Sequence, residues 1–424
     1  MINLNKLTYF FTFSFPLALL LGRFTTDLIV SLSSLLIILI FLKYRSYREF
    51  FDIYAIIFFI FSLYMIVRSL FSIDPILSLE ASLFYFRFGL FFLAVLFSIK
   101  FYKDWIKMFF YSFLLAYLLI IIICFVEIFF KFNLTIYLLT GYNAEVQNAV
   151  YSNKRITGIF GTDIMLGSFI SRTIPIFVAS LILFYENNKS KYLHYVAILF
   201  IPILFFLNLL SFERSAIIYF LIFIIVFCLF NQKFKKISLL LLFLLLIIFT
   251  SSLFLIKSFF NRLITTTLSQ GNFVEKPIFS IPDIYIAYFN TAYNIFLENI
   301  FFGVGTKIYR LECKNHITLL DSCNTHPHNY YVQILAELGL VGFIPIALLF
   351  SVIIYKVTKH IYSVIIRNNY LISDYKLCLF ISCIIGLFPF LPTGSFYNNY
   401  TSAILFLTFA ILAHSSKNYY KKQQ

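Results

Sequence analysis

Two of the chain's six histidines lie in a polar segment that runs directly into a long apolar stretch. His326 and His328 occur in Thr325–Gly342, which reads THPHNYYVQILAELGLVG. Pro327 restricts the preceding residue to an extended conformation, and Asn329 stands where a helix N-cap is expected. A helix N-terminus disfavours a protonated histidine and favours bound anions. A neutral imidazole at this position suits general-base chemistry near neutral pH, and the alternative is a cap or surface histidine.

Arginines form a second group with chemical potential. Arg155 opens the segment RITGIFGTDIMLG, Arg172 lies one to two helical turns into the apolar stretch that follows, and Arg214 heads another such stretch in SFERSA. A charged side chain inside an apolar span is costly and usually faces a cavity or a partner. The guanidinium group stays ionised and offers a bidentate fork for phosphate. A structural salt bridge to the neighbouring Glu213 is the alternative.

Two cysteines are spaced in the same way from histidines, as Cys313-x2-His316 and Cys323-x2-His326. Three interpretations are open: a disulfide, a zinc site built from both pairs, and two unpaired thiols. An oxidising location outside the membrane favours the disulfide. The other four cysteines fall inside apolar stretches and are expected to be small core residues. These are Cys124, Cys228, Cys378 and Cys383.

The composition is that of an integral membrane protein. Of the 424 residues, 61% are hydrophobic and only 12% are charged, and the mean hydropathy is +0.92. Soluble domains are about half apolar and about a quarter charged. The net charge of +15 therefore reports membrane orientation rather than nucleic-acid binding.

Apolar runs predict an all-α fold with about twelve transmembrane helices. The runs are Leu7–Leu21, Leu28–Leu42, Ile53–Val67, Leu83–Ile99, Met108–Phe130, Ile164–Tyr185, Tyr192–Leu210, Ala216–Phe230, Ile237–Ile256, Tyr331–Tyr355, Leu377–Leu391 and Thr401–Ala413.

Lysines and arginines divide between the two sides of this layout. With twelve spans, 16 of the 22 lysines share a side with both termini, which predicts that this side is cytoplasmic. Eight of the eleven arginines fall on or near the opposite side, which indicates that they are recruited there, although some could only snorkel at helix ends. These eight are Arg23, Arg68, Arg87, Arg155, Arg172, Arg214, Arg262 and Arg310.

A long loop between spans nine and ten, Lys257–Tyr330, is predicted to lie outside the membrane. Within it, Ile284–Ile300 has apolar residues at helical spacing and predicts an amphipathic helix at the membrane surface. The glycines of Phe302–Gly305 then end that helix. Since no repeat or linker divides the chain, residues 1–424 are expected to form a single polytopic membrane domain.

Three segments resemble the signatures of the O-antigen ligase and polymerase superfamily. HPHNYYVQILAELGLVG resembles its histidine-asparagine, glutamine and glutamate-x-glycine motif. RITGIFGTDIMLG resembles its arginine-glycine-phenylalanine-glycine segment, FERSA its helix-heading arginine, and ENIFFGVG its Gly-x-Gly segment. The resemblance covers roughly residues 155 to 350.

The resemblance implies a bacterial inner-membrane glycosyltransferase that uses an undecaprenyl-pyrophosphate-linked glycan on the periplasmic side, without metal, nucleotide or other cofactor. It implies that Arg155 and Arg214 hold the pyrophosphate and that His328 activates the acceptor hydroxyl. Arg172, His326 and Asn329 are expected to join them in binding substrate.

The first expectation for function is an O-antigen ligase that transfers a preassembled glycan to an acceptor such as lipid A core, in lipopolysaccharide biosynthesis. The alternatives are a polysaccharide polymerase that joins lipid-linked repeat units, a protein O-oligosaccharyltransferase, and a non-enzymatic transporter of the lipid-linked glycan. A transporter predicts arginines spread across the membrane, whereas an enzyme predicts them gathered on one face with the histidine.

Overall fold

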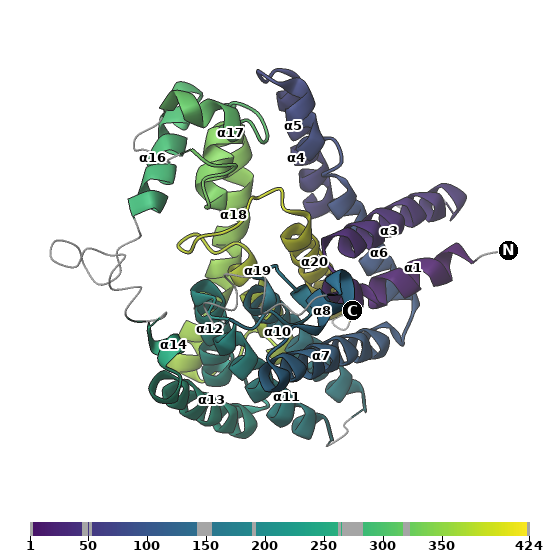
Figure 1. Ribbon diagram of the computed structural model, residues 1–424. Coiled ribbons are helices and arrows are strands. Elements are labelled where there is room, and N and C mark those ends of the chain that lie inside the picture. The colour runs from purple at the N-terminus through teal and green to yellow at the C-terminus, as the bar shows by residue number, and fades with distance from the viewer. Residues whose placement is uncertain are drawn as a thin grey trace.

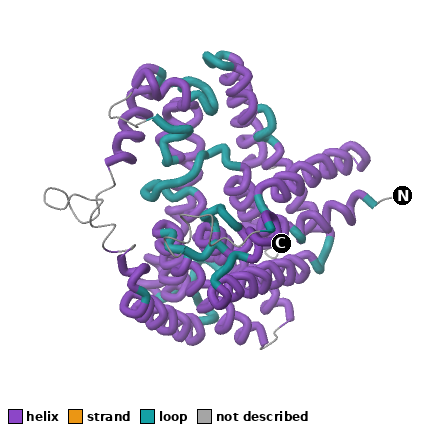
Figure 2. The backbone as a smooth tube through the Cα atoms, in the orientation of Figure 1, coloured by secondary structure: helices purple, strands orange, loops and turns teal. Residues whose placement is uncertain are grey.

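The computed structural model describes residues 3–44, 50, 53–141, 155–188, 192–261, 264, 283–316 and 323–421. Within these ranges every regular element is a helix (Figures 1 and 2). Arg262 and parts of the expected 257–330 loop lie outside the described residues. The first half of the chain forms α1 (Leu4–Phe13), α2 (Phe15–Leu20), α3 (Arg23–Tyr44), α4 (Ile53–Leu70), α5 (Pro75–Ser82), α6 (Arg87–Phe101), α7 (Trp105–Phe130), α8 (Leu134–Thr140), η2 (Gly158–Phe160) and α10 (Leu166–Asn188).

The second half supplies the remaining helices. They are α11 (Tyr192–Leu210), α12 (Arg214–Phe230), α13 (Lys235–Leu255), α14 (Lys257–Phe260), α16 (Asp283–Glu298), α17 (Tyr309–Glu312), η4 (Cys313–His316), α18 (Tyr330–Arg367), α19 (Asp374–Gly386) and α20 (Asn399–Lys421). Each of the twelve predicted apolar runs contains a helix that covers most of it, and α16 confirms the helix expected over Ile284–Ile300.

Six helical segments of the described chain are long and apolar enough to cross a membrane. Four shorter apolar helices accompany them. Large apolar side chains such as Leu42, Phe129 and Phe254 are exposed on the outside of the bundle, where a lipid environment would cover them. These features support a multi-pass membrane protein, whereas the full count of twelve spans stays a prediction. The six long segments are Arg23–Tyr44, Pro75–Phe101, Trp105–Phe130, Leu166–Glu186, Lys235–Leu255 and Tyr330–Arg367.

Proline and glycine explain where the helices depart from the predicted runs. The first run is divided at Ser14 into α1 and α2, because Pro16 has no N–H to continue the ladder. The run expected to end at Leu391 stops at Gly386, shortly before Pro389. The run from Tyr331 extends beyond its predicted end to Arg367, and it contains a break at Gly339.

The molecule has one large core and a smaller one that bears the histidine segment. The large core joins α1–α3, α6, α7, α10–α13, α19 and α20, with α10 packed between α7, α12 and α19. The smaller core lies where α16, residues 304–313 and the first turns of α18 meet, and it includes Ala292, Ile308, Tyr309, Cys313 and Ala336. In Figure 1, α16, α17 and the start of α18 stand together above the helices of the large core. The loops that join the two groups run through the middle of the view in Figure 2.

Candidate active site

The segment Ile300–Gly305 crosses α18 at the break in that helix. The Val304 and Gly305 amides donate to the carbonyls of Ala336 (3.0 Å) and Glu337 (2.8 Å). In the other direction, the Leu340 amide donates to the Ile300 carbonyl at 2.9 Å. A helix that breaks frees N–H and C=O groups, and the crossing segment binds those groups here.

Two glycines allow the backbones to approach this closely. Gly303 has φ +65° and Gly339 has φ +63°, both in the region that disfavours other residues. A Cβ atom at Gly339 would overlap the Phe301 carbonyl and the Phe302 amide, and one at Gly303 would overlap the backbone between Glu337 and Leu338. The Gly-x-Gly segment and the Glu-x-Gly segment of the sequence are therefore two halves of one contact.

Side chains from α4 bind the carbonyl groups of this crossing. The Tyr64 hydroxyl donates to the Leu338 carbonyl at 2.7 Å, and the Arg68 Nε donates to the Gly303 carbonyl at 3.0 Å. Arg68 is one of the eight arginines that the sequence places on or near the exoplasmic side. In this structure its guanidinium binds backbone carbonyls. Below it, the hydroxyls of Ser69, Ser78 and Thr306 form a buried network at 2.8–2.9 Å.

The histidine segment is anchored at both ends. At its start, Cys323 forms a disulfide with Cys313, which is fully buried in the smaller core. At its end, Asn329 caps α18 by accepting from the amides of Tyr331 (2.9 Å) and Val332 (3.2 Å). The predicted cap is therefore confirmed, and the pairing leaves neither cysteine for the zinc alternative. The four remaining cysteines are free and buried, as predicted.

The loop between α19 and α20 closes over the histidine segment. The Asn329 Nδ2 donates to the Pro389 carbonyl at 2.6 Å, and the Thr393 amide donates to the His328 carbonyl at 2.8 Å. Further along α18, Gln333 accepts from the Phe396 amide at 2.8 Å. Pro389, Thr393 and Phe396 of this loop thus hold the chain at His328 and at the start of α18.

His328 adopts a conformation that is uncommon for its residue type. Its φ is +56°, in the left-handed region, where side chains other than glycine are strained and where functional residues are over-represented. The ring packs against two tyrosines of α16, with ring centroids 5.7 Å from Tyr285 and 5.5 Å from Tyr288. The backbone and the aromatic neighbours together point the imidazole at α16.

The hydrogen bond from Asn324 determines which ring nitrogen of His328 carries no proton and can act as a base. The Thr325 amide donates to the Asn324 Oδ1 at 2.7 Å, so the amide nitrogen of Asn324 faces the other way. That nitrogen lies 3.2 Å from the His328 Nε2. Since an amide nitrogen only donates, Nε2 is the acceptor and the ring proton lies on Nδ1. The segment therefore presents a neutral imidazole with a basic Nε2.

Both histidines of the pair are neutral at pH 7. Burial lowers the pKa of His328, and a backbone hydrogen bond with Thr393 opposes this in part. Burial, followed by the neighbouring His328 and Arg310, lowers the pKa of His326 to about 4. The two rings are 4.2 Å apart between centroids, so a proton on one would repel a proton on the other. The arrangement suits proton acceptance rather than a permanent cation.

The arginine segment is held by two buried carboxylates. Glu127 accepts from the Gly158 amide at 2.7 Å and from the Thr157 amide at 3.3 Å, next to Arg155. Glu213 accepts from the amides at the start of α10, Gly167 at 2.7 Å and Ser168 at 3.1 Å. The two carboxylates thus bind backbone groups at both ends of the segment between Arg155 and α10.

The charges of two arginines act on Glu213, and a third arginine directly follows it in the chain. Burial raises the pKa of this carboxyl to about 7, and the charges of Arg155 and Arg172 oppose that shift. The Ile156 amide donates to the Leu210 carbonyl at 3.2 Å, which joins the start of the arginine segment to the turn before α12. Arg214 is the first residue of α12 and directly follows Glu213. The structure therefore brings Arg155, Arg172 and Arg214 to one corner of α10 and α12.

Tyr219 lies between this arginine group and the start of α18. The Arg172 guanidinium is 5.3 Å above the Tyr219 ring, and the same tyrosine interacts electrostatically with Tyr330. The Tyr219 ring is also 5.8 Å from Phe388, which precedes the proline that binds Asn329. One tyrosine and one loop thus connect the arginine group to the residues that flank His328.

A polar cavity of about 360 Å³ opens beside the arginine group. It is lined by the start of α3 and by residues 397–400 at the start of α20, including Arg23, Asp27 and Tyr400. Arg23 is 3.4 Å from Asp163 in the arginine segment, and Tyr400 interacts electrostatically with both Arg23 and Arg172. The cavity therefore lies along the edge of the arginine group.

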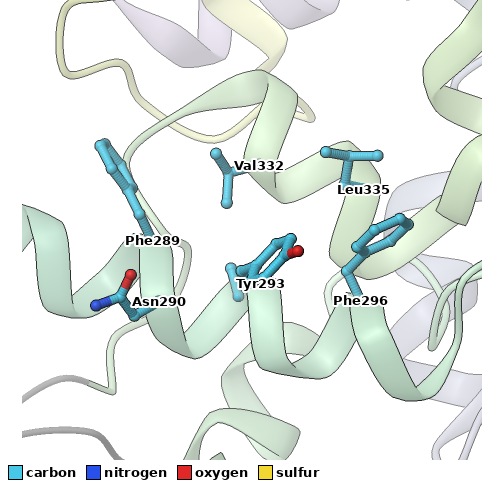
Figure 3. Close-up of a pocket in the computed structure, with 7 residues that line it drawn as sticks. Phe289, Asn290, Tyr293, Phe296, Val332 and Leu335 are labelled. Carbon is cyan, nitrogen blue, oxygen red and sulfur yellow. The ribbon is translucent and has the colours of Figure 1, made fainter.

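An apolar groove of about 250 Å³ lies on the other side of the histidine segment, between α16 and α18 (Figure 3). Phe289, Tyr293 and Phe296 of α16 face Val332 and Leu335 of α18 across it. The first lining residue, Phe289, directly follows Tyr288, which contacts His328. Apolar substrate groups could be held at this side of the imidazole.

Several residues of the site were missed in the sequence. Asn324 and Tyr288 carry no motif in one sequence, because their roles come from tertiary contacts with His328, which is 4 and 40 residues away. Arg310 was among the arginines expected outside the membrane, but its place beside the histidine segment was not predicted. Glu213 was considered as an arginine partner; the charges of Arg155 and Arg172 act on it, and it also accepts from the Gly167 and Ser168 amides. Glu127 was considered for the same role, and it accepts from the Thr157 and Gly158 amides. The burial of Glu127 at the end of an apolar helix was the available signal.

A comparison with known proteins identifies the superfamily. Residues 197–347 match the family model described as O-antigen ligase, which confirms the superfamily that the sequence motifs predict. The matched range includes Arg214, the Gly303 and Gly339 crossing and both histidines, whereas Arg155 and Arg172 precede it. A search of curated proteins found no match. The family match supports a glycosyltransferase of the O-antigen ligase and polymerase class.

Proposed function

We propose that this protein is an O-antigen ligase: it transfers a glycan from undecaprenyl pyrophosphate to a hydroxyl of a lipid acceptor such as lipid A core. The reaction would take place on the periplasmic face of the bacterial inner membrane, with both termini in the cytoplasm. The observation that carries this proposal is the neutral His328, whose Nε2 is kept as a hydrogen-bond acceptor by Asn324.

In this mechanism His328 is the general base. Its Nε2 would accept the proton of the acceptor hydroxyl as that oxygen attacks the anomeric carbon of the glycan. Because the pKa of His328 is lowered by burial, the imidazole is ready to accept a proton at neutral pH. Asn324 would give way to the acceptor hydroxyl, which takes over the hydrogen bond to Nε2.

The arginine group would stabilise the leaving group. One bond forms between the acceptor oxygen and the anomeric carbon, and the bond between that carbon and the diphosphate oxygen breaks. The diphosphate leaves with its extra negative charge, which Arg155, Arg172 and Arg214 would neutralise through bidentate contacts. The energy of transfer is stored in the diphosphate linkage, so the proposal needs no nucleotide.

Reconstituted transfer tests the proposal. Purified protein in liposomes would be given an undecaprenyl-pyrophosphate-linked glycan and, in separate reactions, a lipid A core acceptor, a second lipid-linked repeat unit or a protein acceptor. We expect product only with lipid A core, and we expect His328→Ala to lower the rate roughly 100-fold or more. His316→Ala is the matched control, because His316 lies in the same part of the chain and pairs with Glu298 at 3.5 Å.

Transfer at the wild-type rate in His328→Ala would remove this residue from the mechanism. Product only with the repeat unit or the protein acceptor would reassign the chain to a polymerase or a protein glycosyltransferase. Movement of the lipid-linked glycan across the bilayer, without transfer and unchanged by His328→Ala, would show a transporter instead.

A further inference from the structure

In the part of the chain that the structure describes, Arg310 has a buried side-chain nitrogen without a partner, whereas most charged side chains near it are paired. Lys307 pairs with Glu80 at 3.0 Å, His316 pairs with Glu298 at 3.5 Å, and Glu312 accepts from Asn315 at 3.1 Å. Among the residues that the structure describes, the Arg310 guanidinium has no hydrogen bond or ion pair, and its Nε is buried. A buried donor without a partner is uncommon in folded proteins and calls for an explanation.

A ring nitrogen of His326 is, like the Arg310 Nε, buried without a hydrogen-bond partner among the described residues. The His326 Nδ1 lies 3.0 Å from the Thr325 hydroxyl, and in the tautomer in which that hydroxyl donates to Nδ1, the ring proton lies on Nε2. Within the described chain, that Nε2 is the nitrogen buried without a hydrogen-bond partner. Burial lowers the pKa of His326, and after it the charges of His328 and Arg310 lower this pKa further. The Cys313–Cys323 disulfide joins the turn of Arg310 to the segment of His326.

We propose that Arg310 and His326 form an anion-binding subsite, separate from the Arg155, Arg172 and Arg214 group, that binds a phosphoryl group carried by the acceptor. The inference rests on the proposed function. Guanidinium and imidazole N–H groups are the donors that bind phosphoryl oxygens most directly. The His326 ring contacts the His328 ring, so an acceptor bound there would place a nearby hydroxyl at the general base.

The group of Arg155, Arg172 and Arg214 and the subsite of Arg310 and His326 would bind two different substrates. Arg155 and Arg172 act on Glu213 at the corner of α10 and α12, whereas Arg310 acts on His326 in the smaller core. A transferase that displaces a diphosphate needs the first group for the leaving group. The Arg310 and His326 subsite lies beside the general base, because the His326 and His328 rings are 4.2 Å apart between centroids.

Anion binding tests the subsite without requiring transfer. The full-length protein in detergent would be titrated with inorganic phosphate and with inorganic pyrophosphate, and the midpoint of thermal unfolding would be measured. We expect phosphate to raise the midpoint of the wild type, Arg214→Gln and Lys314→Gln, and to have at least 10-fold weaker affinity for Arg310→Gln. Lys314→Gln is the matched control, because Lys314 is an exposed cation in the same turn. Arg310→Lys, which keeps the charge without the fork, serves if Arg310→Gln does not fold, and it should also bind phosphate more weakly.

The source of the phosphoryl group is settled by kinetics. With a phosphorylated acceptor, Arg310→Gln should raise the KM for the acceptor about 10-fold and leave the KM for the lipid-linked donor unchanged. A rise in the donor KM instead would place Arg310 in the diphosphate site and overturn the proposal. Phosphate affinity equal to that of the wild type in Arg310→Gln, or no phosphate binding by the wild type, would also overturn it. If the wild type binds phosphate but transfers no glycan to any acceptor, the proposed function fails while the subsite stands.

Discussion

The arginine group and the histidine segment are held in place by different means. Arg155 precedes η2, Arg172 lies in the second turn of α10, and Arg214 begins α12. The carboxylates of Glu127 and Glu213 fix the backbone between Arg155 and α10. The histidine segment belongs to the smaller core, where a disulfide, an N-cap and a loop from elsewhere in the chain hold it.

The difference teaches what each part of the site can tolerate. Arginines that bind a diphosphate act through the position of their guanidinium groups and through the number of N–H donors. The packed helices of the large core fix that position. A general base must in addition keep one tautomer and a low pKa, so single contacts around His328 matter more. The loss of activity on substitution near the arginines should therefore scale with the number of hydrogen-bond donors removed. Substitutions near His328 should instead change how the reaction rate depends on pH.

The largest effect is expected at the crossing of the two glycines. Gly339→Val places a side chain on a backbone with φ +63° and into the backbone of Phe301 and Phe302. We expect the variant to lose at least about 3 kcal/mol of stability and all transfer activity. Unfolding in detergent and the transfer assay measure this. Gly394→Ala, where an added Cβ meets nothing within 4 Å, is the control. A stable and active Gly339→Val would show that the crossing does not position the histidine segment.

The next effect belongs to the arginine group. Arg214→Lys keeps the charge but loses the planar fork, so we expect the transfer rate to fall roughly 100-fold at saturating acceptor. The reaction should keep its wild-type dependence on pH, because the general base is unaltered. Arg367→Lys at the far end of α18 is the matched control. Wild-type rates in Arg214→Lys would mean that this arginine only snorkels to the membrane surface.

The membrane fold could be predicted from the sequence, because apolar runs of this length have few other solutions. All twelve runs contain helices, and the helix over Ile284–Ile300 and the Asn329 cap follow from local periodicity and local hydrogen bonding. The break at Gly339 was not predicted, since its cause is a segment about 35 residues earlier that supplies the missing backbone partners. Apolar composition alone cannot distinguish a straight helix from one that is crossed.

The candidate site was predictable only where a residue type carries its own chemistry. Arg155, Arg172 and Arg214 were found because a cation in or beside an apolar helix is conspicuous, and the structure brings all three to Glu213. Asn324 was not found, because its function depends on the Thr325 amide that fixes its orientation. The role of Arg68 also depends on tertiary contacts, since its partners are carbonyls more than 230 residues away.

A smaller effect is expected when the partner of His328 is given a charge. Asn324→Asp would place a carboxylate 3.2 Å from Nε2 and would raise the pKa of His328. The other groups that face this ring are the neutral His326, Tyr285 and Tyr288, none of which opposes the new charge. The base is active only when unprotonated, so the activity lost on acidification should be lost at higher pH in the variant, by about 1 unit.

The pH dependence of kcat/KM measures this shift. We expect Asn324→Asp to be about 2-fold slower than the wild type at the raised pKa, about 10-fold slower on the acidic limb well below both pKa values, and to approach wild-type rates as the pH rises. Asn315→Asp adds the same charge at an exposed position of the same region and should leave the acidic limb in place. A pKa shift of equal size in both variants would mean that any negative charge in this region raises the pKa of His328, and that the direct contact to Nε2 is not required.

The smallest effect should come from Tyr288, and it separates ring packing from hydrogen bonding. Tyr288→Phe removes only the weak contact of 3.4 Å between the hydroxyl and the Asn324 amide, so the rate should stay within about 2-fold of the wild type. Tyr288→Ala removes the ring that lies 5.5 Å from His328 and should lower kcat about 10-fold. Because the Asn324 contact to Nε2 remains in both variants, the acidic limb of the pH profile should not move. An equal loss in Tyr288→Phe and Tyr288→Ala would mean that the hydroxyl, rather than the ring, orients the imidazole, and the distinction drawn between the two regions would then rest on hydrogen bonds alone.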